Sequence, residues 1–180
     1  MILITNDEVS ENALALAGRK FDLWAWSEAL HVGPVGKTYD LSTFARDRAL
    51  VFQYHGWDEC QEVEADFKAR NDALLRGLGD GEEVVLLFGA GIRDQLTLAR
   101  LAAWLMNQAS ERLNCVKVSV SNKMIPNDSS DALWELIDHA EPAGETNLAE
   151  YESMWTAFVS DDPPDLEASF QTIKSVSLQA

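Results

Sequence analysis

Seven polar or ionisable side chains follow three short apolar runs of the sequence. They are Asn6 and Asp7 after MILIT, Glu28 and His31 after FDLWAW, and Arg93, Asp94 and Gln95 after VVLLF. A carboxylate near an imidazole can exchange protons with a substrate, so Glu28, His31 and Asp94 are the candidate catalytic residues. Asn6, Asp7, Arg93 and Gln95 are the candidate ligand-binding residues, with Arg93 the group for an anionic ligand.

Each of these residues also has a structural interpretation. His31, which precedes Val-Gly-Pro, is of a type that often hydrogen-bonds the backbone of its own loop. Asp94 fits the first turn of a helix, where an acid interacts favourably with the helix dipole. Asn6 and Asp7 could cap a first helix. Arg93 could pair with a local acid.

The stretch LLFGAGIRDQLTLARLAAWL, residues 86–105, raises the alternative of a phosphate-binding loop. It contains only two of the three glycines of the dinucleotide fingerprint, because Asp94 stands at the third position and would repel a phosphate. The sequence contains no GxxxxGK[ST], GxSxG or HExxH motif. Its three histidines show no local metal spacing, so no metal site is expected, and no cofactor is identified.

Four short apolar or alternating segments predict strands, at residues 1–5, 21–26, 84–88 and 116–122. Helical patterns predict helices between and after them. These helices are one ending at Gly18, 41–52, about 58–79 with Gly79 as its cap, 92–113, 128–140, 147–159 with a capping box, and one starting at Asp162.

This order predicts an α/β fold with a small, parallel, four-stranded Rossmann-like sheet and helices on both faces. Right-handed crossovers favour the strand order 2-1-3-4. We expect residues 1–123 to form the sheet domain and residues 124–180 an acidic helical extension packed on it. Ligands of such sheets bind beyond the carboxyl ends of the strands, where the seven polar residues would meet.

The sequence is strongly acidic, with 14 basic and 30 acidic residues and a net charge of −16. Twelve of the acids, but only one base, lie in residues 124–180. Such a field opposes binding to nucleic acids and to anionic membranes. It indicates either a solvated surface or a docking face for a basic protein partner.

Compartment and membrane signals point to a cytoplasmic protein. The first residues lack the basic region of a secretion signal, and no apolar run approaches the roughly 18 residues of a membrane span. Cys60 and Cys115 lie far apart and outside any CxxC motif, as expected for unpaired thiols in a reducing compartment.

The six tryptophans are distributed over predicted strands and helices. We expect core packing for five of them, namely Trp24, Trp26, Trp104, Trp134 and Trp155. Trp57, beside His55 and Gly56 in a predicted loop, is the one candidate contact residue. Its alternative role is a hydrophobic staple at a helix start.

Five ordered segments resemble a bacterial family, the domain-of-unknown-function 1835 family, along nearly the whole chain. They are LITNDE, WAWSEALHVGPV, ARNDALL, VVLLFGAGIRDQLTLARLAAWL and WTAFVSDDPPDLEA. The resemblance implies no known activity, because the family is functionally uncharacterised.

The resemblance also singles out particular loop residues. The family pattern W-R-D-x-L-H-E-G-P is matched at Trp26, Glu28, Leu30, His31, Gly33 and Pro34, with Val32 in place of a glutamate. The pattern W-F-E-H-D-x-x-D-Q is matched at Phe88, Asp94 and Gln95. Gly89, Ala90 and Gly91 replace its Glu-His-Asp, so the resemblance implies that an acidic site has been lost here.

Three functions are compatible with these features. The first, which we expect, is the binding of a small, anionic molecule at the strand-end loops without catalysis. The second is a catalytically inactive family member whose acidic surface binds a protein partner. The third is a nucleic-acid-linked regulator, which the net charge opposes.

Overall fold

The computed structural model describes residues 1–6, 20–122, 129–144 and 148–160. The predicted helix ending at Gly18, the predicted helix starting at Asp162 and the predicted capping residue Asn147 lie outside these ranges.

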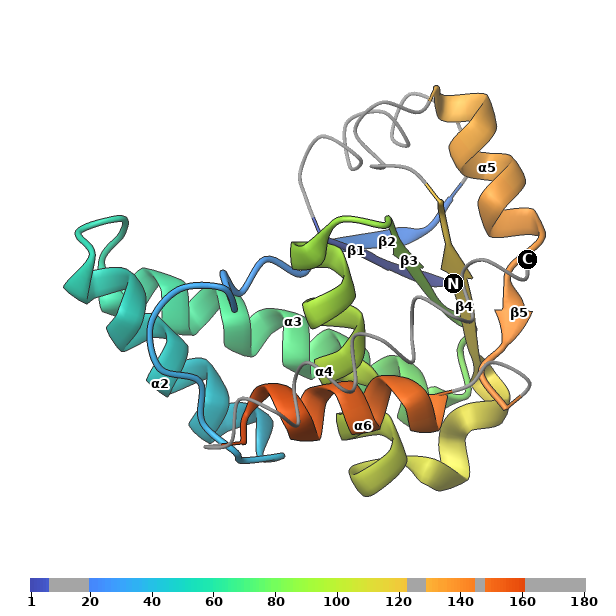
Figure 1. Ribbon diagram of the computed structural model, residues 1–180. Helices are drawn as coiled ribbons and strands as arrows, with labels where there is room; N and C mark the ends of the chain where they lie inside the picture. Colours follow the sequence, from blue (N-terminus) through green and yellow to red (C-terminus); the bar gives the residue numbers. More distant parts are fainter. Residues whose placement is uncertain (7–19, 123–128, 145–147, 161–180) are drawn as a thin grey trace.

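A five-stranded sheet forms the centre of the molecule (Figure 1). Its strands are β1 (Ile2–Thr5), β2 (Asp22–Ala25), β3 (Val84–Phe88), β4 (Val116–Val120) and β5 (Glu141–Pro142). The strand order is β2-β1-β3-β4-β5. The first four strands are parallel, which confirms the predicted 2-1-3-4 order. The fifth strand pairs antiparallel to β4 and was not predicted, because a two-residue strand has no periodicity to detect.

Helices occupy most of the remaining described sequence. They are α2 (Leu41–Tyr54), α3 (Cys60–Asp80), α4 (Ile92–Gln108), the short 3-10 helix η1 (Ser110–Cys115), α5 (Ser130–Asp138) and α6 (Leu148–Phe158).

Two predicted helix ends were wrong. The C-terminal cap of α3 is Gly81, with a φ of 72°, and not Gly79, because Gly81 is the residue that adopts the left-handed conformation. The helix predicted for residues 92–113 ends at Gln108, where the backbone of Ala109 turns to a φ of −141° and η1 follows.

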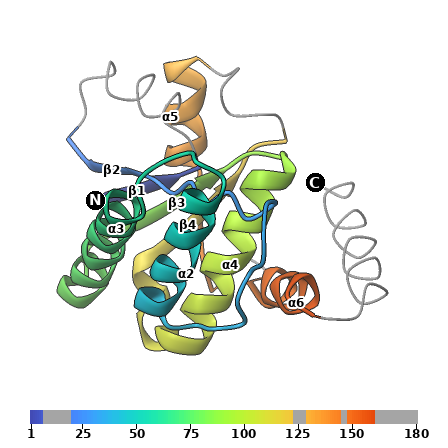
Figure 2. The ribbon, with the colours of Figure 1, turned by 90° about the vertical axis from the view of Figure 1, so that its left-hand side faces the viewer.

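Two layers of helices enclose the sheet (Figures 1 and 2). All five residues of β3 are buried. Leu86 and the residues that share its side of the strand pack in one cluster with α3 and α4, while Val85 and Leu87 pack with α5 on the opposite face. Burial on both faces explains why this strand is apolar without alternation, as its sequence predicts.

Two further helices pack outside this core. Ala45 and Ala49 of α2 contact Val63 and Phe67 of α3. The helix α6 lies against α4, and its Trp155 is almost fully buried there. The residues after Asn122 thus supply α5 to one face of the sheet, β5 to its edge and α6 to the opposite side (Figure 2).

Four of the five tryptophans with predicted core roles, Trp26, Trp104, Trp134 and Trp155, are buried. The fifth, Trp24, is half-buried and packs against the core from the edge strand β2. Trp57 is 47% exposed and stacks on His55, with ring centroids 4.9 Å apart.

Cys60 and Cys115 are both free thiols. Among the described residues, no helix combines the length and apolarity needed to span a membrane.

Candidate functional site

The carboxyl ends of β1, β2 and β3 bring three polar segments to one edge of the sheet. They are Asn6 after β1, the loop 26–34 after β2, and the turn 89–91 that leads into α4. The predicted ligand contact Asp7 lies outside the described residues.

Asp94 ties the ends of two strands together. Its Oδ1 accepts a hydrogen bond of 2.6 Å from Asn6 Nδ2, and its Oδ2 accepts one of 2.6 Å from the backbone N–H of Gly89. Gln95 Nε2 donates to the carbonyl oxygen of Gly89, also at 2.6 Å. The hydroxyl of Thr97 donates 3.3 Å to Asn6 Oδ1. Asp94 is therefore a first-turn acid of α4, and both of its oxygens are engaged.

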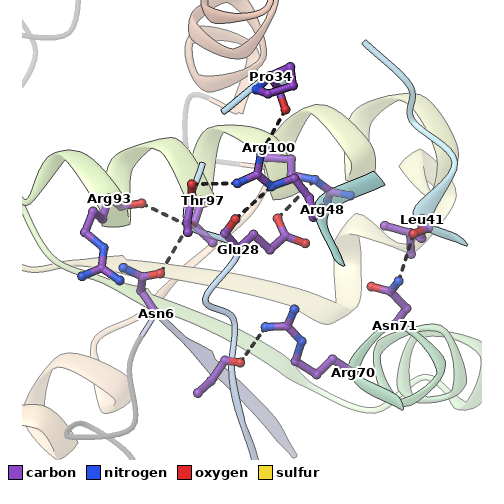
Figure 3. Close-up of polar contacts among 12 residues, drawn as sticks. Asn6, Glu28, Pro34, Leu41, Arg48, Arg70, Asn71, Arg93, Thr97 and Arg100 are labelled. Atoms are coloured by element: carbon purple, nitrogen blue, oxygen red, sulfur yellow. Dashed lines mark hydrogen bonds and ion pairs between the residues drawn. The ribbon is translucent and has the colours of Figure 1, made fainter. Parts of the chain in front are cut away.

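Glu28 is buried at the centre of a cluster of arginines (Figure 3). Its side chain is 3% exposed, and its Oε2 lies 3.3 Å from Arg100 Nε. The guanidinium carbon of Arg100 lies 3.7 Å from the ring centroid of Phe44. Within the described part of the chain, no hydrogen bond or ion pair joins Glu28 to His31. The carboxylate is thus held by an arginine instead of the nearby imidazole.

Arg48 organises the loop that carries Glu28. It donates four hydrogen bonds, of 2.8–3.0 Å, to backbone carbonyl oxygens of this loop. Figure 3 shows Arg48 between Glu28 and Pro34, two of the acceptor residues. The acceptors are Glu28, Ala29, Val32 and Pro34. A loop without regular secondary structure has many carbonyl groups to satisfy, and one buried guanidinium satisfies four of them here.

Arg70 is the third buried arginine and lies near the end of β2. Its Nη1 donates 2.9 Å to the carbonyl oxygen of Ala25, and its guanidinium carbon lies 4.2 Å from the ring centroid of Phe67. Its Nε lies 3.7 Å from the carboxylate of Asp66, which is 65% exposed. The ion pair between Arg70 and Asp66 is therefore open to water on the Asp66 side, which weakens it.

The charges of this cluster do not balance. Among the described residues, three buried guanidinium groups, those of Arg48, Arg70 and Arg100, interact with a single buried carboxylate, that of Glu28. Burial lowers the pKa of all three arginines, and the negative charge of Glu28 opposes that shift. Arginine remains charged in proteins, so the interior behind the sheet edge is positive although the whole chain is acidic.

His31 and Arg93 are exposed at this positive edge. Partial burial, followed by the positive charges of Arg93 and Arg48, lowers the pKa of His31 below its ordinary value of 6.5. This direction is opposite to the effect of an adjacent carboxylate. Arg93 forms no ion pair with any residue that the structure describes, so the local acid considered for it is not found there.

The Gly-Ala-Gly turn leaves the start of α4 open. Gly91 is the N-cap residue and provides no side-chain hydrogen bond to the first turn. A methyl group built at Gly91 would meet no atom of the described residues within 4 Å. The helix start therefore presents free space and partial positive charge next to Arg93.

Four residues of this edge were missed by sequence reasoning: Arg48, Arg70, Thr97 and Arg100. Their signal was a polar residue inside an apolar helix stripe, as with Arg100 between Ala99 and Leu101. Within the described ranges, no group of three or more histidine, cysteine or acidic side chains is arranged to hold a metal ion.

A scan against protein-family models and searches of curated proteins and of solved structures found no match to this chain.

Proposed function

We propose that this protein binds a small, anionic molecule at the carboxyl edge of its sheet, between His31 and the first turn of α4. The observation that carries the proposal is the excess of positive charge at this edge. Among the described residues, the guanidinium groups of Arg93 and of the three buried arginines outnumber the carboxylates of Glu28 and Asp94. The charge of Asp94 opposes an anion, and its two oxygens already accept hydrogen bonds from Asn6 and Gly89.

Two further features support an anionic ligand. The uncapped start of α4 supplies backbone N–H groups and the positive end of a helix dipole. Gly91 leaves space for a ligand to approach the backbone, because no described atom lies near the position of a side chain there. Arg93 can then pair with a carboxylate or phosphate oxygen from the side.

The proposed activity is binding without catalysis. Both oxygens of Asp94 accept hydrogen bonds that hold the loop, and the carboxylate of Glu28 is buried against Arg100. A general base must reach the proton that it removes. His31 is then the one candidate catalytic side chain that remains exposed, and we assign it to ligand contact.

Isothermal titration calorimetry tests this proposal with inorganic phosphate, sugar phosphates, nucleotides and small carboxylates. We expect at least one of these probes to bind the parent protein, and Arg93→Ala to weaken that binding about tenfold or more because an ionic hydrogen bond is lost. His31→Ala should have a smaller effect in the same direction.

Arg76→Ala is the matched control, because Arg76 is exposed near the end of α3 that precedes the opposite edge of the sheet. It should leave the affinity unchanged. The proposal is wrong if none of the probes binds, or if Arg76→Ala weakens binding as much as Arg93→Ala does.

We also infer that the chain is related to the domain-of-unknown-function 1835 family and works in the bacterial cytoplasm. The residues of its W-x-x-x-L-H-x-G-P pattern coincide with the loop that Arg48 and Arg100 hold. Two free thiols support a reducing compartment.

A further inference from the structure

A second candidate site lies along β2, which forms one edge of the sheet. A cleft of about 560 Å³ separates this strand from the end of α2 and the first turns of α3. Its volume falls in the range of roughly 300–1,000 Å³ that is typical of small-molecule sites. Arg70, whose buried charge also contributes to the positive edge, lines this cleft, whereas His31, Arg93 and the first turn of α4 do not.

Two side chains that line the cleft, Arg70 and Trp24, contain buried N–H groups without hydrogen-bond partners among the described residues. These groups are Nε and Nη2 of Arg70 and Nε1 of Trp24. Arg70 is only 2% exposed; its Nη1 donates to Ala25, while its Nε lies 3.7 Å from the carboxylate of Asp66. Buried donors are nearly always satisfied in folded proteins, so these groups indicate a missing acceptor.

The rim of the cleft has the opposite polarity. Asp58, which precedes the N-cap residue of α3, and Glu62, in the first turn of α3, are both exposed and line the cleft. Asp66 is paired with Arg70, so these two carboxylates are the uncompensated charges of the cleft. They attract a cationic group and repel an anion.

Between Arg70 and the rim, the cleft is aromatic and aliphatic. Phe52 and Phe67 meet edge to face, with ring centroids 5.7 Å apart, and both line the cleft. The guanidinium of Arg70 packs over one face of the Phe67 ring, so a ligand's alkyl chain would lie along the remaining aromatic surface.

We propose that the cleft binds a cationic amino acid, with one carboxylate and a basic side chain. The carboxylate accepts hydrogen bonds from Arg70 and Trp24, the alkyl chain lies along Phe52 and Phe67, and the terminal ammonium or guanidinium group pairs with Asp58 and Glu62. The unpartnered nitrogens of Arg70 and Trp24 are enclosed by protein atoms. The ligand carboxylate therefore reaches them when the Trp24 side chain shifts.

Calorimetric titration with lysine tests this assignment, together with two analogues that each remove one feature. Cadaverine lacks the carboxylate, and glutamate reverses the charge of the side chain. We expect lysine to bind more tightly than cadaverine, and glutamate not to bind. Lysine binding should also change the fluorescence of Trp24, and this change should be absent in the Trp24→Phe variant.

The variants separate the two ends of the site. Asp58→Asn combined with Glu62→Gln should weaken lysine binding about tenfold, while Asp72→Asn, at an exposed acid of the same helix outside the cleft, should leave it unchanged. Trp24→Phe keeps an aromatic ring but loses the N–H donor. It should therefore weaken the binding of lysine and leave the binding of cadaverine unchanged.

Three results would overturn the proposal. They are no lysine binding at millimolar concentration, equal affinities for lysine and cadaverine, and equal effects of Asp72→Asn and the double rim variant. Arg93→Ala should not alter lysine binding, so this site and the anion site are tested separately.

Discussion

At the scale of single residues, Arg48 illustrates how a buried charge can organise a loop. The segment after β2 has no regular secondary structure, and Arg48 binds four of its carbonyl groups. The loop in turn places Glu28 beside Arg100 and leaves His31 exposed. The position of the proposed ligand contacts thus depends on a side chain that does not itself reach the ligand.

We expect Arg48→Ala to lower the free energy of unfolding by about 3–5 kcal/mol, because it leaves the Glu28 charge less compensated and removes the donors of one buried and three partly buried hydrogen bonds. Urea denaturation measures this change. Arg46→Ala is the control on the same helix, since Arg46 is 61% exposed, and it should change stability by less than about 0.5 kcal/mol. Similar losses in the two variants would contradict this role of Arg48.

The pKa of His31 reports the positive field at the sheet edge. Burial and then Arg93 are the largest causes of its lowering. We therefore expect Arg93→Ala to raise the pKa of His31 part of the way towards 6.5, as measured by NMR titration of its ring protons. Arg46→Ala should leave it unchanged. An unaltered His31 pKa in Arg93→Ala would place the two side chains too far apart for a shared ligand.

The same shift gives a direction for stability against pH. Because the folded-state pKa of His31 lies below its ordinary value of 6.5, the unfolded chain binds this proton more readily. The contribution of His31 to stability is present above pH 6.5 and decreases as the pH falls through the folded-state value. His31→Ala should reduce the loss of stability in this window.

At the scale of elements, α3 contains two glycines with opposite environments. Gly77 faces the sheet, and a methyl group there would collide with the side chain of Ile2. Gly79 lies on the exposed side of the same helix, and a methyl group there would meet nothing within 4 Å. The close approach of α3 to β1 therefore depends on Gly77 and not on Gly79.

We expect the two alanine variants to change stability in opposite directions. Gly77→Ala should destabilise the protein by about 1–3 kcal/mol, because the packed core must shift. Gly79→Ala should stabilise it by about 0.5 kcal/mol, because alanine loses less backbone entropy in a helix. Denaturation midpoints measure both, and a stable Gly77→Ala variant would refute the close packing of α3 on β1.

At the scale of the whole molecule, the described parts of the chain share one continuous packing arrangement. Trp155 of α6 is 1% exposed and packs with Phe44 of α2 and with residues of α4. An acidic C-terminal segment is thereby joined to the sheet through an apolar contact, which does not depend on its charge.

We expect Trp155→Ala to destabilise the whole protein by about 3–5 kcal/mol through cavity formation. Far-UV and near-UV circular dichroism should still report one coincident thermal transition, at a lower temperature. Trp57→Ala, at a side chain that is 47% exposed, should cost much less. Two separate transitions in the parent protein would show that α6 and the sheet unfold independently.

The sequence alone determined the main elements and their order in the sheet. Apolar runs and helical spacing record which side of each element is buried, and crossover handedness limits the arrangement of parallel strands. This was sufficient for β1 to β4, for the described helices α2, α3 and α4 and for the edge where the polar loops meet. Local patterns did not reveal β5, which is too short to have a period.

Only the tertiary structure decided which polar groups meet at that edge. Glu28 and His31 are three residues apart, yet Glu28 pairs with Arg100 from a distant helix. Asp94 likewise accepts hydrogen bonds from Asn6, which is distant in the sequence, and from Gly89. Ion pairs and hydrogen bonds form between groups that packing brings within a few ångströms, and separation along the sequence does not encode that distance.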